Sequence, residues 1–135
     1  MPLKVTLKPR EKAIIGGAVV TNAGGKTELI IENNVPILRQ KDVLTAAQAT
    51  TPCKRIYLVI QLMYVDEKNL ALHQRTYWSL VHDVVQAAPS MVSFIDQISA
   101  RINEGNYFSA LKLAKRLIAY EAEVISHVRS NRKSL

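Results

Sequence analysis

The spacing of apolar residues changes near residue 42, and this change constrains the fold more than any other feature of the chain. Residues 3–8 alternate strictly between apolar and polar side chains, and short apolar runs broken by turn residues follow up to residue 41. Beyond that point apolar residues recur every three or four positions over long stretches. A period of two is typical of strands and a period of 3.6 of helices. The sequence therefore predicts an α+β protein, with a small N-terminal β module followed by a C-terminal helical bundle.

The β module is predicted to span residues 1–41 and to contain five short strands. Pro9 ends the first strand because proline has no N–H to donate to a ladder. Two adjacent glycines, Gly16 and Gly17, permit the positive φ of a tight turn. Further strands are expected at residues 13–15, 18–21, 28–32 and 36–41. So many short strands favour a barrel-like module or a strongly bent sheet. Such a module has little core of its own, so it should pack against the bundle or a second copy.

The helical bundle is predicted to span residues 42–135. Thr51 and Pro52 form a helix start, because a threonine hydroxyl caps the first turn and proline fits its first position. That helix should run to about Val65 and lie at the centre of the bundle, since it is apolar almost all round. Further helices are expected at residues 45–49, 70–88, 91–102 and 107–129, with a frayed tail at 130–135. The last helix is expected to bury Phe108, Leu111, Leu117, Ile118, Ala122, Ile125 and Val128.

Positive charge is concentrated in the first part of the chain. The net charge is +7, and residues 1–55 carry nine Lys/Arg against four Asp/Glu. Such a distribution indicates a polyanionic partner, nucleic acid above all. The alternative is a solvated cationic face without a ligand. The β module has no aromatic residue, so bases cannot stack on it as they do on RNA-recognition sheets. RNA contacts there would rest on cations, amides and backbone groups.

No set of residues predicts an enzyme. His82 and Asp83 are sequence neighbours, so on a helix they point about 100° apart. Residues 25–27 resemble the end of a phosphate-binding loop, but its first glycine and its following helix are missing, which favours a turn with an exposed lysine. Cys53, at a helix N-terminus, could form a thiolate, but without a base at motif spacing a packing role is favoured. We expect no catalytic residue, no metal and no cofactor.

The location of the protein is predicted from segments that it lacks. The first twelve residues have no apolar core of a signal peptide. The longest apolar stretch, residues 56–65, is too short to span a bilayer. The single cysteine fits a reducing compartment. We therefore expect a cytoplasmic protein without membrane contact.

Five strings, in order and over essentially the whole chain, resemble one family. They are MPLKVTLKP, KAIIGGAVVTN, LIIENNVPILRQKDVLT, TPCKRIYLVIQLMY and GNYFSALKLAKRLIAYEAEV. They resemble the flagellum biosynthesis repressor FlbT family. The resemblance implies a post-transcriptional regulator that binds the 5′ untranslated region of flagellin mRNA and lowers its translation or stability, although some relatives support flagellin expression. It also implies FlaF, a second small regulator that the family often opposes, as a candidate partner.

The segment from Lys4 to Leu44 also resembles the small translational repressor CsrA. The shared pattern is a first strand ending in a base, an Ile-Gly turn, an Ile-rich strand and a Val-x-x-x-Arg strand. By position, the resemblance implies that Lys4, Lys8 and Arg39 bind RNA. The spacing differs, and Pro9 stands where an extra base would follow Lys8. With Arg10, which follows Pro9 directly, the expected RNA-binding residues are Lys4, Lys8, Arg10 and Arg39, close together on the β module.

A second function from a different class stays open. The bundle holds every aromatic residue and could bind flagellin or a flagellar chaperone, so that its effect on mRNA would be indirect. Self-association is a further expectation. A β module of about 40 residues exposes strand edges and lacks core, and pairing of modules would cover both. We therefore expect a dimer or a higher oligomer.

Overall fold

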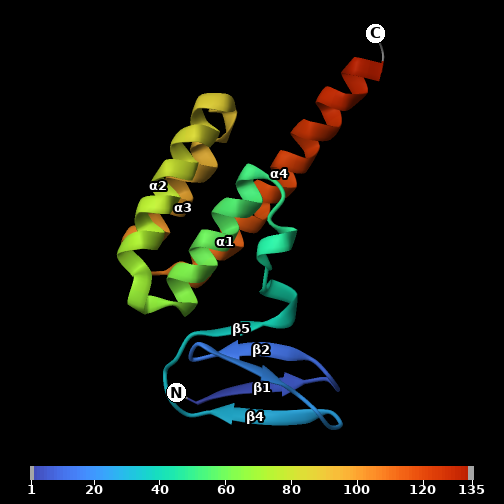
Figure 1. The fold of residues 1–135 in the computed structure, drawn as a ribbon, viewed down its shortest axis with the longest axis vertical. Coiled ribbons are helices and arrows are strands. Elements are labelled where there is room, and N and C mark those ends of the chain that lie inside the picture. The colour runs from blue at the N-terminus through green and yellow to red at the C-terminus, as the bar shows by residue number, and fades with distance from the viewer. Residues whose placement is uncertain (1, 134–135) are drawn as a thin grey trace. The chain divides into compact units, whose positions relative to one another are not determined.

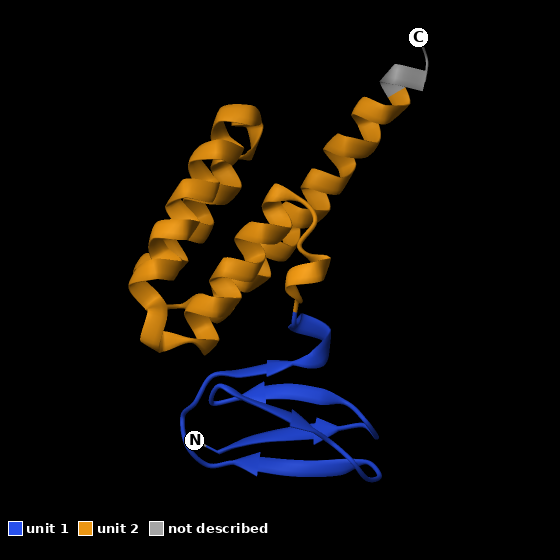
Figure 2. Cartoon of the chain, in the orientation of Figure 1, with its two compact units in different colours: residues 1–43 blue, residues 44–135 orange. Residues whose placement is uncertain are grey.

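The computed structural model describes residues 2–133, with side chains up to Ser130. The chain forms two compact units, unit 1 (residues 1–43) and unit 2 (residues 44–135), which Figure 2 shows in different colours. Every strand of the described residues lies in unit 1 and every α-helix in unit 2. The predicted α+β class is thus confirmed, and the secondary structure changes where the apolar period changes.

Unit 1 contains two small antiparallel sheets. One pairs β1 (Leu3–Leu7) with β4 (Thr27–Ile31), and the other has the order β3 (Ala18–Thr21), β2 (Lys12–Ile15), β5 (Ile37–Arg39). The described residues form no closed barrel, because no ladder joins the two sheets. The last strand ends at Arg39 rather than at Lys41, since Gln40–Asp42 form a 3₁₀ turn.

The two sheets share one core. The alternation of β1 directs Val5 and Leu7 inward, and Leu7 is 1% exposed. Ala13 of the other sheet completes the buried centre. The partly buried side chains around it come from both sheets: Ile15, Leu29, Ile31 and Ile37. Burial of this small apolar set holds the two sheets together. Val19 and Ile30 lie on the outer faces of the sheets and are exposed.

Unit 2 is built from four α-helices and short 3₁₀ turns (Figure 1). The helices are α1 (Pro52–Val65), α2 (Leu70–Ala87), α3 (Val92–Asn103) and α4 (Tyr107–Lys133), with 3₁₀ turns at Ala46–Gln48, Glu67–Asn69 and Pro89–Met91. The predicted start of α1 is confirmed, because the Thr51 hydroxyl accepts a hydrogen bond from the Lys54 N–H at 3.2 Å. The central position of α1 is also confirmed: it packs against both α2 and α4.

The last helix departs from the expectation in its length and its burial. It continues to Lys133, beyond the predicted end at 129. Leu111 and Leu117 are buried as expected, but Ile125 is 37% and Val128 46% exposed. The apolar period indicates which face of a helix is apolar, but not how far a neighbouring helix covers it. No helix within residues 2–133 is both long enough and apolar enough to cross a membrane.

Candidate nucleic-acid interface

Two turns meet at one end of unit 1, and one asparagine joins them. Residues 8–11 connect β1 to β2, and residues 22–26 connect β3 to β4. The Asn22 side-chain amide donates to the carbonyl oxygens of Lys8 at 3.0 Å and Gly25 at 2.9 Å. The backbone adds a bond from the Arg10 N–H to the Asn22 carbonyl at 2.8 Å. The side chains of both turns therefore project from the same end of the unit.

Three exposed cations gather at this end. The register of β1 and β4 ends with Leu7 opposite Thr27, which places Lys8 and Lys26 just beyond the last pair, on neighbouring strands. Arg10 lies in the turn next to them, and all three side chains are exposed. We call Lys8, Arg10 and Lys26 the cationic turn end. Because these three cations lie on adjoining turns, their like charges repel one another, and a bound anion would relieve the repulsion.

Arg10 has an unusual backbone conformation. Its φ is 66°, the only positive φ of a non-glycine among the described residues. Arg10 is the third residue of a turn that the Glu11 N–H closes onto the Lys8 carbonyl at 3.0 Å. A glycine or asparagine is the usual residue at such a position, because the left-handed conformation costs an L-residue about 1–2 kcal/mol. An exposed arginine at this cost indicates a use for its side chain.

Arg39 lies behind the cationic turn end and makes structural contacts. Its backbone belongs to β5, and its Nη2 donates to the carbonyl oxygen of Thr6 in β1 at 2.6 Å. The same nitrogen lies 3.4 Å from Glu11 Oε2. This side chain therefore links the two sheets where no ladder joins them. Its Nε is buried and has no protein acceptor, while 40% of the side chain is exposed.

Glu11 is the negative charge within this group. Its Oε1 accepts the Lys8 backbone N–H at 2.8 Å, and Arg39 contacts its other oxygen. The Lys8 backbone hydrogen bond lowers the pKa of Glu11, and the neighbouring Arg39 guanidinium lowers it further. Glu11 is therefore ionised at neutral pH and offsets part of the local positive charge.

Lys4 lies apart from the other expected ligands. It stands four residues before Lys8 on β1, which is about 13 Å along a strand. Its ammonium pairs with Glu28 at 3.2 Å. Of the four expected ligands, the structure thus brings three together. Glu11 contacts both Lys8 and Arg39, and Arg10 lies beside Glu11 in the same turn. Lys4 is not part of this group. The prediction that these four residues bind RNA remains a prediction.

Sequence reasoning missed Lys26 as part of this group. It recognised the exposed lysine of a turn but had no means of pairing it with Lys8, because the register of β1 and β4 connects residues about twenty positions apart. An alternation search along one strand cannot reveal a neighbour on another. The asparagine that joins the two turns gave no signal in the sequence beyond a turn residue.

The other residues considered for chemistry have ordinary surroundings. Cys53 is fully buried, and burial raises the pKa of its thiol, as does the neighbouring Glu121 carboxylate. A protonated buried thiol is a packing group. His82 and Asp83 are both exposed on α2. Within the described residues, no group of three or more His, Cys, Asp or Glu side chains could hold a metal ion.

The fold and its charges define a class: a small two-unit α+β protein with a cationic end on its β unit. Residues 3–125 match the family described as "Flagellar protein FlbT". The chain belongs to the FlbT family. No solved structure matches it.

Several curated relatives share this family. A protein of Bradyrhizobium diazoefficiens, named "Probable flagellum biosynthesis repressor protein FlbT 1", is 46% identical over 92% of this chain and 85% of its own length. A relative from Rhodopseudomonas palustris is 41% identical, over 93% of this chain and 99% of its own. The Caulobacter vibrioides "Flagellum biosynthesis repressor protein FlbT" is 35% identical, over 96% of this chain and 94% of its own length. These names describe repressors and not enzymes.

Proposed function

We propose that this chain is a post-transcriptional regulator of flagellin synthesis, which binds the 5′ untranslated region of flagellin mRNA and lowers its translation or stability. The names of the relatives, repressors of flagellum biosynthesis, support the flagellar part of this proposal. The cationic turn end supports the RNA part. It is the single observation that carries the proposal, because three exposed cations from two turns form a surface that suits a phosphate backbone.

The contacts would be of two kinds. Lys8 and Lys26 pair with phosphates, which gives affinity without sequence information. Arg10 reaches a base edge, since a guanidinium can donate two parallel hydrogen bonds to guanine. Arg39 already donates to the Thr6 carbonyl, so its part is to hold the two sheets in place beneath the turns. Stacking on rings plays no part in unit 1, which has no aromatic residue.

A titration at several salt concentrations tests this assignment. A flagellin leader RNA and a scrambled RNA of the same length are titrated with the parent, with Lys8→Ala and with Lys26→Ala. Each lost phosphate contact should flatten the salt dependence of binding by about one unit and weaken both RNAs alike. The control is Lys68→Ala, which removes an exposed lysine from unit 2.

The outcomes separate the proposal from its alternatives. Equal weakening by Lys8→Ala and Lys26→Ala, with an unchanged Lys68→Ala, supports the cationic turn end. If both variants bind both RNAs as the parent does, unit 1 is not the RNA site. If the parent binds neither RNA, the regulation does not act through direct contact with this chain.

A further inference from the structure

The last helix extends beyond the helices that it packs against. α4 has 27 residues, about 40 Å of helix, whereas α1 has 14, about 21 Å. Figure 1 shows the C-terminal part of α4 projecting past the other helices of unit 2. Among the described side chains of α4, Glu121 is the last that is buried. Beyond Glu121, every described side chain of α4 except the partly buried Val124 is exposed.

This projecting part still has an apolar face. Ile118, just before this part, and Ala122 and Ile125 within it follow the i, i+4, i+7 spacing of a helix surface that packs against another element. Val124 and Val128 extend the face on the Ile125 side, away from Ala122. Ile125 and Val128 are 37% and 46% exposed. The apolar period of the buried half of α4 thus continues into a part of the helix whose apolar side chains are only partly covered.

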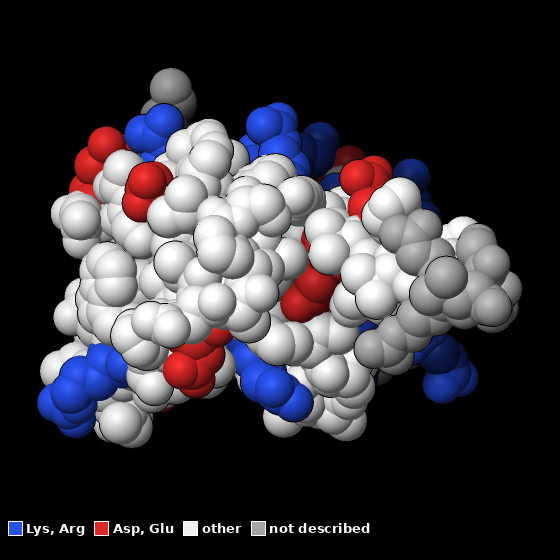
Figure 3. Space-filling view, turned by 90° about the horizontal axis from the view of Figure 1, so that it is seen from above, with Lys and Arg blue, Asp and Glu red and all other residues white. Residues whose placement is uncertain are grey.

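Two hollows flank this face and meet along it. One, of about 540 Å³, lies between α4 and the start of α1, and the other, of about 410 Å³, between α4, α1 and the end of α2. Both are lined by Glu121 and Ile125, and the more exposed Ile125 forms the ridge between them. We call this surface the α4 groove. In Figure 3 the middle of the face seen from above is mostly uncharged, apart from acidic atoms in one hollow.

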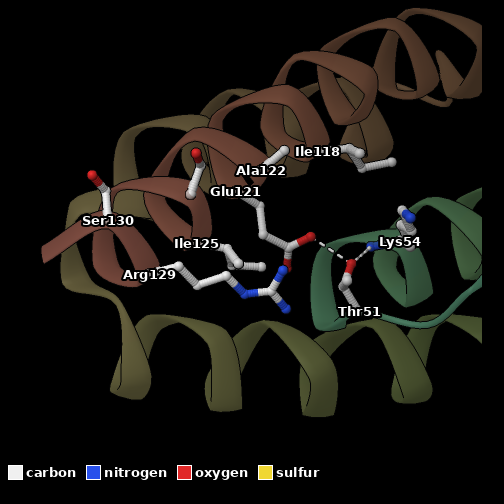
Figure 4. Close-up of a pocket in the computed structure, with 9 residues that line it drawn as sticks. Thr51, Lys54, Ile118, Glu121, Ala122, Ile125, Arg129 and Ser130 are labelled. Carbon is white, nitrogen blue, oxygen red and sulfur yellow. Dashed lines mark hydrogen bonds between the residues drawn. The ribbon is translucent and has the colours of Figure 1, made fainter. Parts of the chain in front are cut away.

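The floor of the groove is fixed by a buried carboxylate. Glu121 accepts the Thr51 hydroxyl and, at 3.0 Å, the backbone N–H of Cys53. It is 6% exposed and satisfies two donors at the first turn of α1. In Figure 4 its side chain points toward Thr51 rather than out of the groove. The charge of Glu121 is therefore already engaged within the protein.

The charges that remain on the first hollow are positive. Lys54 and Arg129 line it from α1 and α4, as Figure 4 shows. The second hollow has Asp83 among its lining residues, so the positive side of the groove is the side of α1. An apolar ridge with cations along one side is complementary to a helix with an apolar stripe and carboxylates along one side.

We propose that the α4 groove binds an amphipathic helix of a partner protein, with its apolar stripe on Ile125 and its carboxylates facing Lys54 and Arg129. A second copy of this chain fits less well. Residues 122–133 carry three Lys/Arg and one Glu, so two such segments would bring like charges together. The proposal rests on unit 2 alone and does not depend on RNA binding by unit 1.

Two designed peptides test the groove. Both have about 18 residues, close to 27 Å of helix, with leucine at i, i+4 and i+7 spacing. One carries glutamates along one flank, and the other carries lysines at the same positions. The full chain is titrated with each fluorescently labelled peptide. The parent should bind the glutamate peptide at least about tenfold more tightly, since like-charge contacts are strongly unfavourable.

Three variants locate the binding. Ile125→Asp should weaken binding of the glutamate peptide at least about tenfold, because it charges the ridge. Arg129→Glu, at an exposed position, should shift the preference toward the lysine peptide and keeps the test valid if Ile125→Asp does not fold. The matched control is His127→Asp, which adds a carboxylate on the exposed face of α4 away from the hollows and should change nothing.

Other results overturn the proposal. Equal binding of both peptides by the parent, or no saturable binding of either, removes the charge-selective groove. Parental binding by a folded Ile125→Asp, or an unchanged preference in Arg129→Glu, does the same. If sedimentation shows a dimer that Ile125→Asp converts to a monomer, a second copy occupies the groove instead of a partner helix.

Discussion

Replacing Arg10 separates the stability of unit 1 from its charge. Arg10→Gly and Arg10→Ala both remove one exposed cation. Both keep the backbone hydrogen bond from residue 10 to the Asn22 carbonyl, because it uses only the main chain. They differ in one respect: the φ of 66° suits glycine and is unfavourable for alanine.

The size of the effect follows from this conformation. The left-handed region costs an L-residue about 1–2 kcal/mol, and part of the relief is lost because glycine makes the unfolded chain more flexible. We therefore expect Arg10→Gly to be more stable than Arg10→Ala by about 1 kcal/mol. Arg10→Ala should match the parent to within about 0.5 kcal/mol, since an exposed side chain is removed while the backbone keeps the same strain.

The assay must report on unit 1. The chain has one tryptophan, Trp78, and it lies in unit 2, so intrinsic fluorescence does not follow the strands. Hydrogen exchange of the β1 and β2 amides reports directly on the stability of unit 1. A gain of about 1 kcal/mol corresponds to roughly fivefold slower exchange of these amides. In RNA titrations the two variants should lose the same affinity, because each has lost the same charge.

Two results would refute this reasoning. Exchange that is as fast in Arg10→Gly as in Arg10→Ala would mean that the turn carries no strain. Loss of RNA affinity in Arg10→Ala but not in Arg10→Gly would mean that the backbone conformation, and not the guanidinium, matters for binding.

Three further predictions concern stability. Glu121→Ala should lower the free energy of unfolding of unit 2 by about 2–4 kcal/mol, because the buried Cys53 N–H and the partly buried Thr51 hydroxyl lose their acceptor. Urea titration followed by Trp78 fluorescence measures this change. Arg39→Ala should speed hydrogen exchange in β1 and β5, since the contact with the Thr6 carbonyl links the sheets; unchanged exchange would show that apolar packing alone suffices. The pKa of Glu11 is lower in the folded protein than its ordinary value of 4.5, so the ionised carboxylate stabilises unit 1 at any pH above 4.5. This stability is lost as the pH falls through the lower pKa of the folded state. Hydrogen exchange should therefore distinguish the parent from Glu11→Gln at pH 7 but no longer in acid below that pKa.

Local signals in the sequence were sufficient for the type and order of the main elements, but not for all of their ends. Thr51 and Pro52 predicted the start of α1, because capping and the geometry of proline act within one turn. The alternation of residues 3–8 predicted which side chains of β1 face inward, since a strand has only two faces. The final strand was predicted too long because the 3₁₀ turn at Gln40–Asp42 leaves no clear mark in the apolar pattern.

The candidate site was only partly predictable, because its residues meet through pairings between distant segments. Charge pattern and family resemblance named Lys8, Arg10 and Arg39, but the register of β1 and β4 was needed to bring Lys26 to the same end. The structural contact of Arg39 with Thr6 joins residues 33 positions apart. No period or motif within either segment contains that information.

By itself, the sequence determined the class of the fold, the helix starts, the apolar faces and the family, because each of these depends on residues close together in the chain or on the order of whole segments. Only the tertiary structure decided that two separate sheets form instead of a barrel, that the cations of two turns share one end, and that the apolar face of α4 continues past the helices that cover it. Sequence periodicity gives the direction in which a side chain points. What lies in that direction depends on the lengths and pairings of the other elements, which are fixed only when the chain packs.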